Sequence, residues 1–307
     1  MTRYFARRVL TSVGVALGVL VFTFSMLHLA PGDPVIAMLG RQAATPERIE
    51  ALRGELGLDR PLPVQFADYF GGVLRGELGT SIQTRRPVVD AIAEQLPSTL
   101  QLMLAAMLVA VVIGGVVGVV SATRAGSRLD RSLTVGSLAA VSVPSFWLAL
   151  LLILVFAVWL GWLPAAASSG EVRGLVLPAL ALGIGEGAIL ARLIRANLVE
   201  QLTGPHIDAA RARGLRERRV VGVYALRNAM LPVVTIIGLQ FGYLLAGSVV
   251  IETIFARQGL GRLAVQAVSA QDFPLAQGIV LVMALTYVAI NTLTDLTYVW
   301  LDPRVRL

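Results

Sequence analysis

Long apolar stretches alternate with shorter charged segments along the whole chain. About 20 mostly apolar residues are needed for a helix to cross the hydrocarbon core of a bilayer. Six stretches reach that length, and we predict a membrane-spanning helix in each: 9–29, 99–122, 133–160, 176–198, 233–254 and 276–300. The first is longer than the apolar core of a signal peptide, and PGDP follows it in place of a small-residue cleavage site. We therefore expect it to be a retained span.

The arginines between these stretches predict the orientation, because short cytoplasmic loops carry an excess of positive residues. With the amino terminus inside, the inner segments hold sixteen arginines and the outer segments ten. The long first outer loop also offsets its seven arginines with nine carboxylates. We expect both termini to lie in the cytoplasm.

The first outer loop, 31–97, is too long to be a simple connection and is expected to contain helices. Thr45 and Pro46 form a helix start, and Gly57 forms a helix stop. A second, shorter helix is predicted within 66–79, with an apolar side made of Phe66, Tyr69, Phe70 and Leu74. This pattern favours a folded lid on the outer membrane surface over a separate catalytic domain.

Glycines four residues apart occur within three of the predicted spans. On one face of a helix such a pair lets a neighbouring helix approach closely. The pairs are Gly14/Gly18, Gly114/Gly118 and Gly183/Gly187, and the spacing alone does not identify their partners. Pro144 and Pro178 are expected to kink or start their helices.

Composition supports a membrane protein: 56% of the 307 residues are hydrophobic and 15% are charged. Soluble domains are about 45–50% apolar and about 25% charged. The net charge of +7 follows the loops, so it indicates membrane topology and not a nucleic-acid partner. All 26 basic residues are arginine, which excludes a lysine-dependent phosphate loop, and the lack of cysteine excludes disulfides.

The residues also argue against an enzyme. His28 and His206 are the only histidines, and the predicted topology puts them on opposite sides of the membrane, which excludes a paired-histidine metal site. The sequence contains no G-x-S-x-G nucleophile motif. We expect a non-catalytic chain that holds no cofactor and no metal.

One compact charged segment, HIDAARARGLRERR at 206–219, lies between two predicted spans. Thr203-Gly204-Pro205 is typical of a helix start, Asp208 falls in the first turn, and Gly214 is a helix stop. Three alanines leave one side of this helix small. Two interpretations stay open from the residues alone: an ordinary basic loop, or a short helix that fits a groove in a cytoplasmic partner.

Two carboxylates within the predicted spans are candidates for a functional role, Glu186 and Asp295. Such groups can line a transport path or can hydrogen-bond a neighbouring helix. An ion-driven secondary transporter would also carry them, but we find no clear inverted repeat, and one large basic loop breaks the symmetry.

Several motifs together resemble a known family. D-A-A-x-x-x-G from Asp208 to Gly214, followed by Leu231-Pro232, resembles the EAA loop of ABC importer permeases, with Asp208 in place of a glutamate. Further stretches resemble the dipeptide/oligopeptide/nickel permease branch, in the order expected: PGDP, LGLDRPLPVQF with GGVLRGELGTSI, QLPSTLQL, SVPSFWLALLLILVFAVWLGWLP and LDPRVR.

This resemblance implies an all-α polytopic protein of the bacterial cytoplasmic (inner) membrane, with six transmembrane helices and the ABC importer transmembrane-domain fold. It implies a cytoplasmic amino terminus and first span at 1–30, a helical extracytoplasmic insertion at 31–97, a permease domain at 98–300 beginning near Leu100, and a cytoplasmic tail at 301–307. The cytoplasmic coupling loop would occupy 200–232.

The resemblance also implies partners and sites. The partners are a second, related permease in a heterodimer, two ABC ATPase subunits that carry ATP and Mg²⁺, an extracytoplasmic solute-binding protein and a peptide substrate. The coupling residues would be Asp208, Ala209, Ala210, Arg211, Arg213, Gly214 and Leu215, and candidates for the translocation path are Glu186, Gln240 and Asp295. The cargo stays open among dipeptides, oligopeptides, nickel complexes and glutathione.

Overall fold

The computed structural model describes residues 2–29, 34–39, 45–55, 57–166 and 171–301. Within these residues the chain is helical, apart from turns and one isolated β-bridge between Thr80 and Pro87. The chain divides into two compact units, one holding residues 99–258 and 289–307, and the other holding 2–98 and 259–288. Two long helices, α5 (Val88–Thr123) and α13 (Phe273–Leu301), contribute residues to both units.

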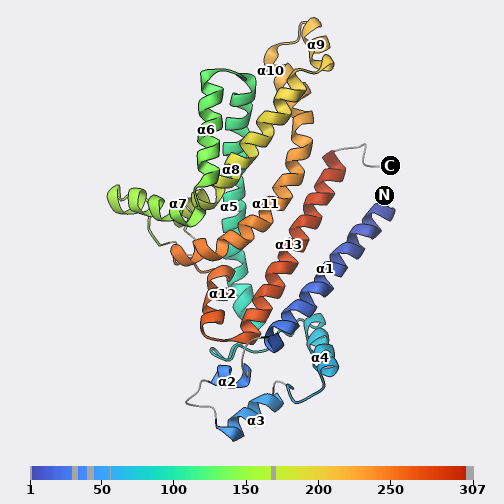
Figure 1. Ribbon diagram of the computed structural model, residues 1–307, viewed down its shortest axis with the longest axis vertical. Helices are drawn as coiled ribbons and strands as arrows, with labels where there is room; N and C mark the ends of the chain where they lie inside the picture. The colour runs from blue at the N-terminus through green and yellow to red at the C-terminus, as the bar shows by residue number, and fades with distance from the viewer. Residues whose placement is uncertain (1, 30–33, 40–44, 56, 167–170, 302–307) are drawn as a thin grey trace. The chain divides into compact units, whose positions relative to one another are not determined.

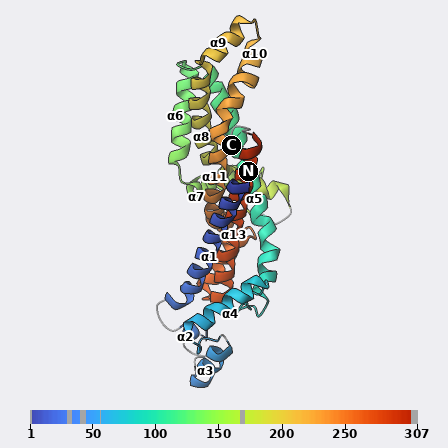
Figure 2. The same ribbon diagram turned by 90° about the vertical axis from the view of Figure 1, so that its right-hand side faces the viewer.

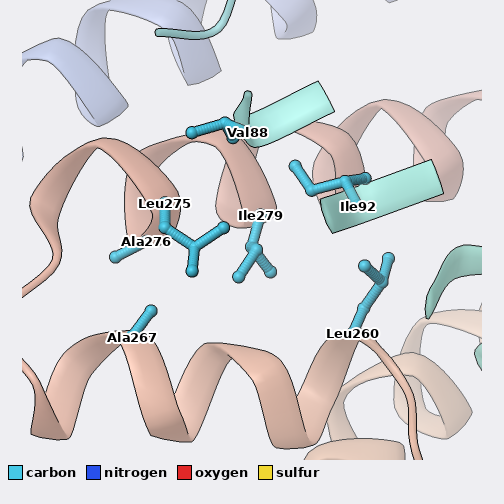
Figure 3. Packing of buried hydrophobic residues seen from close by; sticks show 7 residues of the cluster. All are labelled: Val88, Ile92, Leu260, Ala267, Leu275, Ala276 and Ile279. Atoms are coloured by element: carbon cyan, nitrogen blue, oxygen red, sulfur yellow. The ribbon is translucent and has the colours of Figure 1, made fainter. Parts of the chain in front are cut away.

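The unit that contains the amino-terminal part of the chain includes α1 (Thr2–Leu29), α2 (Pro34–Leu39), α3 (Pro46–Glu55), α4 (Leu62–Leu74) and α12 (Leu260–Ser269). Its core joins the start of α5 to α12 and to the first turns of α13 (Figure 3). The buried members of this core are Val88, Ile92, Leu260, Ala267, Leu275, Ala276 and Ile279. Gly278 permits the close approach, because a Cβ there would lie 2.5 Å from Cγ1 of Val88.

The two helices predicted in the first outer loop are present. α3 begins at Pro46, and Gly57 takes a φ of 64°, as expected for a stop residue. α4 begins at Leu62, four residues before the predicted segment, because Pro61 and Pro63 suit the entry and first turn of a helix. Phe66, Tyr69 and Phe70 form an aromatic group with Phe24 of α1, whereas Leu74 is 71% exposed and stays outside it.

The other unit is built around α8 (Val172–Leu202), which contacts α6, α7 and α11 (Figure 1). The remaining elements of this unit are α6 (Arg128–Ser142), α7 (Ser145–Leu152), η1 (Ile153–Trp159), α9 (Pro205–Ala212), α10 (Glu217–Arg219), η2 (Val220–Ala225) and α11 (Leu226–Ile254). The segments η1 and η2 are π-helical and continue α7 and α10 without a break.

Glycine pairs on α5 and α8 pack directly against each other. A Cβ at Gly118 would lie 2.8 Å from the carbonyl oxygen of Ala191, and one at Gly183 would lie 2.5 Å from that of Ala106. Gly114 and Gly187 are similarly crowded by the opposite helix. The prediction of close packing is therefore confirmed for these two pairs. Around Gly14 and Gly18 of α1 the described residues leave open space.

Four helical segments are long and apolar enough to span a membrane: α5, α8, residues 217–254 and residues 273–294. The described apolar stretch of α1 covers residues 10–26. The predicted span 133–160 is broken near Pro144, as expected for that residue, and α6 and α7 meet there at an angle of 100°. Pro144 starts α7 and holds Val143 in an extended conformation, which breaks the helix. The count of six spans stays a prediction.

Other prolines are accommodated inside helices. Pro97, Pro178 and Pro232 lie within α5, α8 and α11, respectively. α5 therefore begins at Val88, well before the predicted start at residue 99, and crosses the boundary expected at 97–98. Its 36 residues give a length of about 54 Å, more than the roughly 30 Å of a hydrocarbon core, so part of it must lie outside the core.

Candidate functional site

The helix α9 is the short element predicted in the charged segment, and it lies beyond the ends of α8 and α11 (Figures 1 and 2). Gly204 is extended and Pro205 occupies the first helical position, so the chain turns sharply out of α8. The helix ends at Ala212, two residues before the predicted stop at Gly214. Gly214 takes a φ of 76°, and its N–H bonds to the carbonyl of Arg211 at 2.9 Å, so the residues after Ala212 form the helix cap.

The inner face of α9 belongs to the chain's own core. Ile207 is fully buried and Ala210 is 5% exposed. They pack in a cluster with Ala122 of α5, Leu198 of α8, and Val220, Ala225 and Ala229 on the return to α11, with Leu215 partly buried against it. Ala210 and Leu215 were expected to contact the ATPase. In this chain alone, Ala210 is buried in the cluster and Leu215 is partly buried against it, and their contact with an ATPase stays a prediction.

The outer face of α9 is small and charged. Asp208, Ala209 and Arg213 are exposed. Arg211 donates from Nη2 to Oε1 of Glu217 at 2.8 Å and from Nε to Oε2 at 3.3 Å, which links α9 to α10. The Glu217 carboxylate raises the pKa of the Arg211 guanidinium above its ordinary value, so the pair stays charged. Arg211 therefore has a partner within the chain.

A buried ion pair joins α6 to α8 at the same end of this unit. Asp130, at the start of α6, is 2% exposed and receives two hydrogen bonds from Arg195 of α8, from Nε at 2.6 Å and from Nη2 at 2.8 Å. The Gly126 N–H and the Ser121 hydroxyl also donate to it. Sequence reasoning missed this site. The Ser127-x-x-Asp130 spacing is a helix-start signal, but it does not identify Arg195, which is 65 residues away.

Two of the three predicted path residues lie together between α8 and α11. The side-chain amide of Gln240 donates to the carbonyl oxygen of Glu186 at 3.1 Å. Within the described part of the chain, no donor reaches the buried atoms Glu186 Oε2 and Gln240 Oε1. A cavity of about 270 Å³ lies beside Glu186 and is also lined by Pro144 and Tyr243. Asp295 lies on α13, and its side chain is outside the described residues.

A second buried polar group links α5 to the carboxyl-terminal end of α11. Thr99 donates to Oε1 of Glu252 at 2.6 Å, and Arg257 donates to Oε1 of Gln101 at 3.3 Å. Glu252 and Arg257 are each no more than 1% exposed. A lone carboxylate in the apolar run GSVVIETIF was a signal for this site that the sequence reasoning did not use. Among the described residues, no group of three or more metal-ligating side chains could hold an ion.

Two family models match the chain. The model for a binding-protein-dependent transport system inner membrane component matches residues 114–307. The model for the N-terminal part of the corresponding membrane component matches residues 1–103. Together they include α9, Glu186 and the whole of the segment 31–97.

Known proteins agree with this match. A glutathione transport system permease protein of Pectobacterium atrosepticum is 41% identical over 100% of this chain and 99% of its own. A di/tripeptide transport system permease protein of Pseudomonas aeruginosa is 38% identical with the same coverage. Among solved structures, a chain of the inward-facing MetNI methionine ABC transporter has a TM-score of 0.58 at 21% identity, covering 69% of this chain and 96% of that chain.

The structural likeness shows that the helices described above adopt a known fold, that of ABC importer transmembrane domains. The sequence likeness covers the whole chain and includes proteins named for peptide transport. This chain belongs to the family of binding-protein-dependent transport system inner membrane components, as a permease subunit of the peptide branch of ABC importers.

Proposed function

We propose that this chain forms half of the translocation path of an ATP-driven importer of di- and oligopeptides. A second, related permease supplies the other half in a heterodimer. Two ABC ATPase subunits bind ATP and Mg²⁺ on the cytoplasmic side, and an extracytoplasmic solute-binding protein delivers the peptide. The chain transmits the work of the ATPase and performs no catalysis itself.

The two faces of α9 carry this proposal. Ile207 and Ala210 fix the helix to the core of the permease, while Asp208 and Ala209 face away from it. A helix attached in this way moves with α8 and α11 as one body, since its inner face shares their hydrophobic cluster. Its small outer face suits a groove on an ATPase subunit, and Arg213 and Gly214 at its end complete that surface.

Contacts within each unit support the proposed orientation. Ala122, next to the α5–α6 turn, packs in the cluster of α9, so two segments assigned to the cytoplasm meet at one end. In the other unit, Ser81 of the first outer loop donates to Asp272 at 2.5 Å, and Asp272 lies in another segment assigned to the outside. Both contacts join segments that the arginine distribution assigns to the same side.

Glu186 and Gln240 are our candidates for the path within this subunit, with Asp295 as a third. A buried carboxylate oxygen without a donor is costly, so Glu186 favours a position reached by water or by a donor group of the cargo. The cavity beside it provides the space. Relatives named for glutathione and for di- and tripeptides support short peptides as the cargo class.

Reconstitution tests this function. Proteoliposomes would contain this chain, its partner permease and the two ATPases, with the binding protein and labelled dipeptide outside and ATP inside. We expect uptake that disappears when the binding protein, the ATPases or ATP is omitted. Uptake that follows a proton or sodium gradient without the ATPases would contradict the proposal and favour a secondary transporter.

A further inference from the structure

A cavity of about 540 Å³ lies in the unit that contains α1–α4, away from α9 and Glu186 along the chain. α4 and the segment 75–85 form much of its wall, and residues from α1 and α13 complete it. Phe24, Tyr69 and Leu78 give it an apolar side. Its size suits a small molecule, since ligand cavities are commonly about 300–1,000 Å³.

The charged residues around the cavity differ in whether they form ion pairs. Asp68 pairs with Arg60 at 2.9 Å, and Glu77 pairs with Arg75 at 3.1 Å. Arg85 also lines the cavity, and within the described part of the chain no ion pair or hydrogen bond engages its guanidinium. The cavity therefore combines an apolar wall with one arginine, Arg85, that forms no ion pair among the described residues.

The backbone around Arg85 is held in an unusual conformation. Arg85 has a φ of 58°, a region that residues other than glycine rarely adopt and that costs on the order of 1 kcal/mol or more. Its N–H bonds to the carbonyl of Ser81 at 3.0 Å, and the N–H of Ser81 bonds to the carbonyl of Arg86 at 2.9 Å. These bonds close a tight turn that presents Arg85 at the cavity.

A buried carboxylate fixes this turn. Asp272 is 1% exposed and accepts hydrogen bonds from the Ser81 hydroxyl at 2.5 Å and from the main-chain N–H groups of Ile82 and Gln83, each at 3.3 Å. The turn is thus tied to the segment that precedes α13. A cation on such a rigid turn is preorganised, which lowers the entropic cost of binding an anion.

We propose that this cavity binds the carboxyl-terminal end of a short peptide, with the terminal carboxylate on Arg85 and the last side chain against Phe24 and Tyr69. Guanidinium groups bind carboxylates in a two-bonded geometry, and aromatic walls suit an apolar side chain. The inference rests on the proposed function, because it assigns an additional contact to the same peptide cargo. It adds a recognition site to a subunit whose path residues lie elsewhere in the sequence.

The test uses the complete importer in lipid nanodiscs, without ATP and without the binding protein. Saturation-transfer NMR would measure the affinity for the dipeptide Ala-Phe and for its carboxyl-terminal amide. We expect the free acid to bind at millimolar concentrations, and Arg85→Gln to weaken it at least about tenfold, as for the loss of a charged hydrogen-bonded pair. The amide should bind the unaltered protein as weakly as the acid binds the variant.

Two further variants separate recognition from folding. Arg85→Gly removes the guanidinium but suits a positive φ, so the turn is kept and the affinity should still fall. Arg86→Gln changes the adjacent arginine, which pairs with Glu94 and does not line the cavity, and should bind like the unaltered protein. Equal affinity for acid and amide, unchanged affinity in both Arg85 variants, or no dipeptide binding at all would overturn the proposal.

A separate measurement of peptide uptake by the unaltered importer, with its binding protein and ATP, distinguishes failure of the cavity proposal from failure of the proposed function. If uptake proceeds while the Arg85 variants bind dipeptide normally, the cavity proposal fails and the proposed function stands. If uptake is absent from the complete assembly, the proposed function fails. If the cavity instead receives a segment of the binding protein, dipeptide will not bind, and Arg85→Gln will weaken capture of the binding protein.

Discussion

Arg195 on α8 holds Asp130 at the start of α6 through two hydrogen bonds, from Nε to Oδ1 at 2.6 Å and from Nη2 to Oδ2 at 2.8 Å. The carboxylate is almost completely buried, while the Arg195 side chain is one-third exposed. The pair therefore fixes the end of the unit from which α9 projects. Among the described residues, its loss would leave the buried carboxylate with the Ser121 hydroxyl and the Gly126 N–H as its remaining side-chain and main-chain donors.

We predict that Arg195→Gln destabilises the folded chain by about 3 kcal/mol, at the lower end of the range for breaking a buried pair, because Arg195 is partly exposed. Thermal unfolding in detergent would measure the change. Arg86→Gln is the control, since its pair with Glu94 is exposed to solvent and should contribute much less to stability. Equal midpoints for the two variants would show that the buried pair does not stabilise this unit.

Helix packing supplies a second prediction. Gly183→Ala would place a Cβ 2.5 Å from the carbonyl oxygen of Ala106 and should force α5 and α8 apart, at a cost of about 1–3 kcal/mol. Gly185→Ala is the matched control, because two residues further along the same helix a Cβ meets nothing within 4 Å. It should be neutral or stabilising by up to about 1 kcal/mol, the difference in helix propensity. Thermal unfolding of both variants tests this prediction, and similar losses of stability in the two variants would contradict the observed packing.

The glycine pairs show that a sequence pattern can predict a close helix contact but cannot identify the partner helix. The spacing of Gly183 and Gly187 predicts a close helix contact, but only the folded chain identifies α5 as the partner. Gly14 and Gly18 have the same spacing and meet no neighbour among the described residues. Partner choice depends on which helices the connections bring together, and that information is not local.

The polar sites follow the same principle. The start of α9 at Pro205 and its glycine stop were predictable because proline and glycine act on their own backbone. The direction of Ala210 was not, since it depends on residues of α5 and α8. Asp130 with Arg195, and Asp272 with Ser81, join residues 65 and 191 positions apart. No spacing rule connects such pairs.

Topology can be tested directly because the chain has no cysteine of its own. We predict that a cysteine at Glu55 reacts with a membrane-impermeant maleimide added from outside intact spheroplasts, and that a cysteine at Arg213 reacts only after the membrane is opened. The proposal rests on the excess of arginines in the inner segments. Labelling of the Glu55 position only from the cytoplasmic side would reverse the orientation.

The path proposal predicts a selective effect at Glu186. Glu186→Gln removes the carboxyl group beside the cavity with little change in size, so we expect peptide uptake to fall at least about tenfold while the assembled complex still hydrolyses ATP. Glu200→Gln is the matched control, because Glu200 is exposed near the end of the same helix. Normal uptake by the Glu186 variant would remove this residue from the path and leave it a role in packing.

The coupling helix gives the sharpest comparison, because neighbouring alanines face opposite ways. Ala210→Trp would place a large ring in the cluster of Ile207 and Leu198, so we expect it to destabilise the permease itself. Its failure to bind an ATPase would therefore say little about coupling. At Gly214 an added Cβ would meet no neighbouring atom within 4 Å, but Gly214→Val would strain a backbone at φ 76°, with a cost of about 1 kcal/mol or more.

Ala209→Trp is the informative variant. Ala209 is exposed, so the ring leaves the inner face of α9 intact and should not lower the unfolding temperature of the isolated permease. If the outer face enters a groove, the same ring should abolish co-purification of the ATPase subunits or separate ATP hydrolysis from peptide uptake. Replacing exposed Arg218 and Arg219 together by glutamine should affect both much less. Should that double variant lose the ATPase while Ala209→Trp transports normally, the segment would act through its charge, and shape recognition by α9 would be wrong.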